Sequence, residues 1–231
     1  MFANRKSSPK LSFEGLEKRL MMDGNITATF QAGNLLITGD KLANGVSIVG
    51  SAVPGEFVIQ GMQTAYVPTT VNGKHSIIFE HVQNITIDLK AGDDILRVGN
   101  ITGDLTRISG GLTVNPGPGN KTLTVTNVSV GGITSLATGA GNDLVTVEKL
   151  VAKKAFALET GAGNDTVKIR NSVFADLTVN LGGGNDGLVF AGNTVGRKGV
   201  LDSGAGLDSL NANWRKVSTG NISVINFETY F

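Results

Sequence analysis

Several residue types that commonly build functional sites are absent or scarce in this chain of 231 residues. It has no cysteine, which excludes disulfides, thiolate metal sites and cysteine nucleophiles. It has only two histidines and one tryptophan, so catalytic imidazoles and sugar-stacking rings are few. No apolar run reaches the ~18 residues that a membrane-spanning helix needs. The sequence therefore predicts no transmembrane segment.

Charge is also sparse and balanced. Twenty basic residues face nineteen acidic ones, and charged residues make up only 17% of the chain. This balance offers no electrostatic basis for binding nucleic acid or an anionic membrane. The apolar share of 40% is enough for a packed core, which argues against disorder. Glycine is abundant at 32 residues, but without a G-X-Y period and with only five prolines, so a collagen helix is excluded.

The first 25 residues differ in composition from the rest. Phe13, Leu16 and Leu20 are spaced to share one face of a short helix. The basic start is similar to that of a secretory signal, but charged residues interrupt the apolar stretch that such a signal requires. Two interpretations stay open for 1–25: a frayed or surface-docked helix, and an export segment.

This segment resembles a leader found on surface proteins of planctomycete-type bacteria, which has a basic, serine-containing start and an LxFExLExRxLL-like stretch. The matching residues are Leu11, Phe13, Glu14, Leu16, Glu17, Arg19 and Leu20. The spacing around Lys18 departs from that pattern. The resemblance implies export, with the protein at the cell surface or outside the cell.

A repeat runs through the rest of the chain. Four copies of a glycine-rich turn start 22, 21 and 22 residues apart: GAGND at 139–143 and 161–165, GGGND at 182–186 and GAGLD at 204–208. Two degenerate copies precede them, GPGNK at 117–121 and AGDD at 91–94. A near-constant period of this length indicates a repeat architecture.

Apolar residues recur at fixed offsets from each turn. Two residues after the aspartate position stand Leu96, Leu123, Val145, Val167, Leu188 and Leu210. Four residues after it stand Val98, Val125, Val147, Ile169, Phe190 and Ala212. Three residues before the turn stand Ile87, Val114, Leu136, Leu158, Val179 and Leu201. On both sides of the turn, these apolar positions alternate with positions of mixed residue type. This alternation predicts strands with one buried face, joined at a glycine-rich corner.

One such coil cannot bury its apolar face, whereas stacked coils form a continuous core. The sequence therefore predicts an all-β fold: a right-handed parallel β-solenoid with about 22 residues per coil, spanning 26–231. Its expected parts are irregular N-terminal coils or a small meander at 26–82, regular coils at 83–212, and a capping strand at 213–231. The stretch 62–75 is expected to be an exposed loop. An antiparallel sandwich is the alternative fold.

Stacking places like turn residues in columns. Asn120, Asn142, Asn164 and Asn185 are expected to hydrogen-bond from coil to coil. The next column is acidic except at Lys121, which could pair with a neighbouring carboxylate. Two roles stay open for its aspartates: each caps its own turn, or calcium binds between coils and relieves their repulsion. The candidate metal ligands are Asp143, Asp165, Asp186, Asp208 and Asp94, of which the first three are adjacent copies.

The turns resemble the RTX, or haemolysin-type, calcium-binding repeat. GAGNDLV (139–145), GAGNDTV (161–167) and GGGNDGL (182–188) match the GxGxDx[LV] core of that family. The resemblance implies a calcium-bound β-roll in a secreted protein. This chain departs from it in repeating about every 22 residues instead of nine, and in carrying Lys121 at a ligand position.

Together these features predict a non-enzymatic, exported structural or adhesive protein of the cell surface, with calcium as its possible cofactor. Its expected partner is a cell-surface glycan or protein, and end-to-end self-association is a further expectation. The alternative is a small carbohydrate-active β-helix enzyme, for which clustered outward carboxylates and bases would be required. Its candidate residues are Asp88, Glu159, Asp202, Arg97, Lys168 and Arg170.

Overall fold

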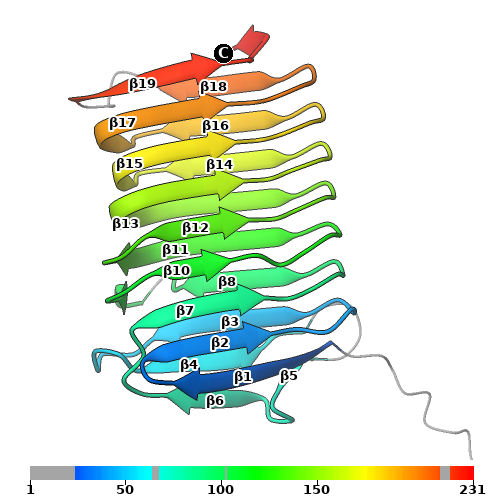
Figure 1. Cartoon of the computed structure of the whole chain (residues 1–231), viewed down its shortest axis with the longest axis vertical. Coiled ribbons are helices and arrows are strands. Elements are labelled where there is room, and N and C mark those ends of the chain that lie inside the picture. Colours follow the sequence, from blue (N-terminus) through cyan, green and yellow to red (C-terminus); the bar gives the residue numbers. More distant parts are fainter. Residues whose placement is uncertain (1–23, 64–67, 102, 214–218) are drawn as a thin grey trace, which may run out of the picture.

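The computed structural model describes residues 24–63, 68–101, 103–213 and 219–231, and the regular elements in these ranges are all β-strands (Figure 1). They form a β-solenoid of about five turns with ~22 residues per coil, as the period predicts. The right hand of the solenoid stays a prediction. Within the described ranges no helix is long and apolar enough to cross a membrane. The predicted leader at 1–25 falls almost entirely outside the described residues, which begin at Gly24.

Each coil contributes to a first face of parallel strands, stacked in register. This face consists of β2 (Asn34–Thr38), β7 (Asn84–Asp88), β10 (Leu112–Val114), β12 (Thr134–Ala137), β19 (Thr219–Ile225) and the later parts of β13 (Leu144–Glu159), β15 (Val173–Asn180) and β17 (Thr194–Asp202). The glycine-rich turns then lead the chain onto a second face. They line up along one edge of the stack in Figure 1.

The second face is also parallel. It consists of β3 (Gly45–Gly50), β8 (Ile95–Gly99), β14 (Thr166–Arg170), β16 (Gly187–Ala191), β18 (Ser209–Asn213), β20 (Thr229–Tyr230) and the first parts of β11 (Thr122–Val130) and β13. A short third face follows, made of β9 (Thr106–Ile108), the end of β11, the middle of β13 and the starts of β15 and β17.

The predicted apolar columns form the core. Leu96, Leu123, Val145, Val167, Leu188 and Leu210 pair in register from coil to coil and are at most 2% exposed. Burial of a side chain of this size contributes roughly 1.5–3 kcal/mol to folding. Ala212 is the exception among the predicted positions, since it is only partly buried.

The corner between the second and third faces was not predicted. The chain bends there at residues with left-handed backbone conformation: Asn127 (φ 57°), Lys149 (φ 53°), Asn171 (φ 52°) and Gly192 (φ 69°). Asparagine and glycine adopt this conformation most readily, so their recurrence at this position of the coil is a sequence signal for the corner. Lysine at one of the four positions hides the pattern.

The N-terminal strands combine two irregular first coils, since β2 and β3 stack parallel on β7 and β8, with an antiparallel meander. β1 (Asn25–Gln31) is antiparallel to β2, and β3 is antiparallel to β4 (Phe57–Gly61), which pairs in turn with β6 (Ser76–Phe79). The exposed loop predicted at 62–75 is wrong in part, because β5 (Thr70–Val71) lies within it and pairs with β1. Thr69 and Val71 are buried there, and the Gly45 N–H donates to the Thr69 hydroxyl. Residues 64–67 of this stretch lie outside the described ranges.

The C-terminal segment forms two strands where one was predicted. Asn226, with φ of 64°, separates β19 from β20. The two strands continue the first and second faces respectively, each parallel to the strand of the preceding coil.

Candidate functional site

The repeated turns place a carboxylate, an amide and two glycines at the same point of each coil that carries GAGND or GGGND. The glycines are required by the close stacking of the coils. A Cβ atom on Gly184, whose φ is 140°, would lie 1.9 Å from the carbonyl oxygen of Gly163. Only glycine fits there, so the turn motif follows from the coil spacing.

The asparagine side chains link each coil to the one that follows it. The Asn142 N–H donates to the Asn120 Oδ1 at 2.8 Å, and the Asn164 N–H donates to the Asn142 Oδ1 at 2.7 Å. Asp93 begins this exposed ladder and Asn185 ends it, by accepting a hydrogen bond from the Leu207 N–H. The predicted bonding from coil to coil is confirmed.

The aspartates form a second ladder that runs in the opposite direction. Each Oδ1 accepts the backbone N–H of the preceding coil: Asp165 from Asp143 at 2.8 Å, Asp186 from Asp165 at 2.7 Å, and Asp208 from Asp186 at 2.7 Å. Asp94 and Asp143 do the same for the N–H groups of Asn44 and Lys121. The aspartates therefore cap turns, but the expectation that each caps its own turn is wrong. Stacking brings the carboxylate next to the N–H group of the coil before it.

The aspartate carboxylates are buried, in contrast to the exposed amides beside them. Asp94, Asp143, Asp165, Asp186 and Asp208 are 1–3% exposed. Each keeps its second oxygen, Oδ2, out of contact with solvent, and at Asp186 and Asp208 that oxygen has no hydrogen-bond partner among the described residues. A buried acceptor without a partner is costly unless a proton or a cation reaches it.

Burial raises the pKa of four of these carboxyl groups: Asp94, Asp143, Asp165 and Asp186. The pKa of Asp186 rises to about 6, because burial and the charges of Asp165 and Asp208 outweigh its bond from the Asp165 N–H. Threonine hydroxyls beside Asp143 and Asp165 favour the charged form. Leu181 stands at the corresponding position before the Asp186 turn, and it offers no hydroxyl.

Lys121 interrupts the aspartate ladder with a positive charge. Its Nζ lies 3.0 Å from the Asp94 Oδ2, so the pairing of Lys121 with a neighbouring carboxylate is confirmed. The same ammonium donates to the carbonyl oxygen of Pro118 at 2.8 Å and to that of Gly92. A cation at this point of a coil thus contacts one carboxylate and two turn carbonyls.

One member of the ladder could not be found from the repeat. The Asp208 N–H donates to Glu228 Oε2 at 2.8 Å, so Glu228 caps the last turn as the aspartates cap the others. It follows Asp208 by 20 residues and has no glycine motif before it. The position of Glu228, close to one period beyond Asp208, was a weak sequence signal that it caps this turn.

The predicted metal ligands are brought together as a column. In the described part of the chain, no three acidic or histidine side chains converge into a cluster suited to a metal. Each coil with an aspartate in this column offers an ion one buried Oδ2, together with carbonyl oxygens of the glycine turns. Calcium would require ~6–8 such oxygens.

The candidate residues for an enzyme lie on different faces. Asp88, Glu159 and Asp202 lie on the first face, while Arg97, Lys168 and Arg170 lie on the second. Asn180 stands between Glu159 and Asp202 in the stack, so these two carboxylates are two coils, or about 10 Å, apart. Asp88 pairs with Lys90. The fold does not gather these six residues into one cluster.

No family model, no curated protein and no solved structure matches this chain.

Proposed function

We propose that this protein is a non-enzymatic structural or adhesive protein, exported to the cell surface, whose β-solenoid serves as a continuous scaffold. The observation that carries the proposal is the pair of opposed ladders along the turns. The asparagine ladder and the aspartate ladder tie every coil to both neighbours. The polar side chains of the repeat are thus engaged in holding the stack together, which suits a structural role.

The proposal includes calcium as a stabilising ion of the aspartate ladder. The surroundings of Lys121 support it, because they show a positive charge held by a carboxylate and two turn carbonyls. The next coils present aspartates in place of lysine, with Oδ2 atoms buried in a row. A divalent cation there would offset the repulsion between carboxylates that are about 5 Å apart.

The proposed export of the protein to the cell surface is tested on intact cells that produce it naturally. An antibody against the solenoid should detect protein that added protease removes from unbroken cells, while a cytosolic marker stays intact. Protein that is degraded only after the cells are lysed would refute export to the surface.

The non-enzymatic role is tested with a panel of polysaccharides incubated with the purified protein. This incubation should yield no new reducing or unsaturated ends, and sustained turnover would overturn the non-enzymatic role. End-to-end association of solenoids stays a prediction, which sedimentation velocity would test.

A further inference from the structure

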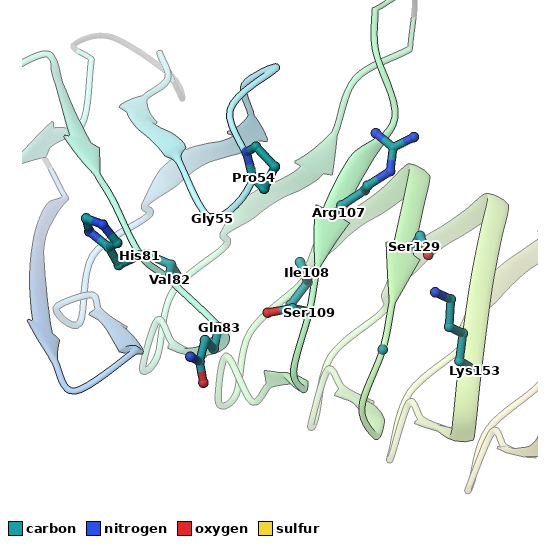
Figure 2. A pocket seen from close by; sticks show the side chains of 11 residues that line it. Pro54, Gly55, His81, Val82, Gln83, Arg107, Ile108, Ser109, Ser129 and Lys153 are labelled. Carbon is teal, nitrogen blue, oxygen red and sulfur yellow. The ribbon is translucent and has the colours of Figure 1, made fainter.

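A cavity of about 550 Å³ lies where the N-terminal meander meets the regular coils (Figure 2). The cavity arises because the chain takes a different path after β3 than it takes at the same point of the later coils. After β3 the chain turns back through 51–56 into the antiparallel strand β4, whereas the later coils continue onto the third face. Among the described strands, β9 therefore pairs on one side only, with β11. The turn at Pro54 and Gly55 stands on its other side and forms a wall of the cavity.

This wall is held in place by backbone hydrogen bonds. The turn closes with the Glu56 N–H donating to the Val53 carbonyl at 3.1 Å, and Gly55 supplies the positive φ of 81° that such a turn needs. The Val82 N–H donates to the Gly55 carbonyl at 2.9 Å, which joins the turn to the segment His81–Gln83. The chain itself thus holds this wall of the cavity, whose volume falls within the ~300–1,000 Å³ of small-molecule sites.

The side chains that line the cavity are basic or neutral. Arg107, Lys153 and His81 supply nitrogen groups, Ser109, Ser129 and Gln83 supply hydroxyl and amide groups, and none of the lining residues is acidic. Arg107 pairs in register with Ser129 on the next coil, and the Lys153 side chain leans toward Ser129 from the coil beyond (Figure 2). In the described ranges, no carboxylate forms an ion pair with Arg107 or Lys153.

The spacing of the two cations favours an extended ligand. The backbones of Arg107 and Lys153 belong to coils two steps apart, about 10 Å along the stacking direction. An oligosaccharide with acidic groups on successive units can span this separation and meet each cation with a separate group. No phenylalanine, tyrosine or tryptophan is among the described residues that line the cavity, so it lacks the large aromatic rings on which nucleic-acid bases commonly stack.

We propose that this cavity binds an acidic oligosaccharide. Arg107 and Lys153 pair with its carboxylate or sulfate groups, because guanidinium and ammonium ions form charge-assisted hydrogen bonds with such oxygens. Ser109, Ser129 and Gln83 exchange hydrogen bonds with the sugar hydroxyls. None of the described lining residues is acidic, so this cavity lacks the pair of carboxylates that glycoside hydrolases use. This inference rests on the proposed surface function and names the class of its partner.

The test is calorimetric titration of the purified protein with four probes. These are tetragalacturonate, a chondroitin sulfate tetrasaccharide, neutral maltotetraose and inorganic sulfate. We expect saturable binding of at least one acidic tetrasaccharide, weakened by salt, and none of maltotetraose or sulfate. The preferred tetrasaccharide identifies whether carboxylate or sulfate groups are recognised.

Three variants separate a built site from general attraction to a basic surface. Arg107→Ala/Lys153→Ala should weaken binding at least roughly tenfold, whereas Lys168→Ala/Arg170→Ala, which removes the same charge from the second face, should leave it unchanged. Ser129→Phe keeps both cations but places a bulky ring on the coil between them, and should weaken binding. Failure of both acidic probes to bind, equal binding of maltotetraose, or equal loss in the Lys168/Arg170 variant would each overturn the inference. The cell-surface test is independent of these results, so the two proposals can fail separately.

Discussion

The Lys121 ammonium lies 3.0 Å from a carboxylate oxygen of Asp94, and both side chains are at most 2% exposed. Lysine stands here at a position where the following coils carry aspartate. The chain thus supplies its own cation at one level of an otherwise acidic column. Burial raises the pKa of Asp94, and Lys121 opposes part of that rise.

Replacing Lys121 with methionine should leave the Asp94 charge buried without a counterion. Loss of one partner from a buried ion pair typically costs about 3–5 kcal/mol in the free energy of unfolding. Urea denaturation measures this loss. Lys90→Met is the control, because its pair with Asp88 is exposed and should cost under ~1 kcal/mol. Asp94→Asn/Lys121→Met should recover most of the stability, and equal losses for the two lysine variants would contradict the prediction.

Stability should increase as the pH falls from about 7 to about 4, contrary to ordinary acid denaturation. The folded pKa of Asp186 is about 6 and its ordinary value is 3.8, so the folded state holds more protons between these values. The charged form therefore weakens the fold above pH 6 by up to about 3 kcal/mol, and this penalty disappears as the carboxyl group is protonated. Chelator in every sample keeps calcium from masking the effect.

Asp186→Asn isolates this contribution. The amide keeps the acceptor for the Asp165 N–H but cannot carry a charge. The variant should exceed the wild type in urea midpoint near pH 8 and lose that advantage near pH 4. A variant that is less stable than the wild type by the same amount at both pH values would show that Asp186 does not titrate as described.

Calcium should raise the melting temperature of the wild type above its value in chelator. Stabilisation by an ion that binds only the folded state follows RT ln(1 + [L]/Kd), so the shift should grow with calcium concentration. The variant Asp143→Asn/Asp165→Asn/Asp186→Asn retains the backbone caps but lacks the charges, and calcium should not shift its melting temperature. Identical melting of the wild type in millimolar calcium and in chelator would exclude the calcium proposal.

Two adjacent glycines should respond differently to alanine. Gly184→Ala would place a Cβ 1.9 Å from the Gly163 carbonyl oxygen, in a backbone conformation with φ of 140°. We expect a loss of about 3 kcal/mol or more in the free energy of unfolding. Gly183→Ala meets only the Ala205 carbonyl, at 3.9 Å, and alanine already stands at this position in other copies. Thermal melts of both variants test the predicted contrast, which comparable losses would contradict.

The sequence by itself determined the period, the buried columns and the two columns of like polar residues at the turns. The coils present the same residue types at the same offsets, so stacking them in register buries Leu96, Leu123 and Val145 together. The glycines carry the same information, because the coil spacing excludes any Cβ at Gly184.

Only the tertiary structure decided what depends on distances between coils or on a departure from the repeat. It placed each aspartate on the N–H group of the preceding coil, and it brought Glu228 to the end of that ladder from a turn without the motif. It also selected Asp94 as the partner of Lys121. The cavity beside Arg107 exists because β3 turns back before reaching the third face, and no single repeat encodes that event. A repeated sequence specifies what its copies share, whereas the sites between copies and at the seam are set by the packing of segments far apart in the chain.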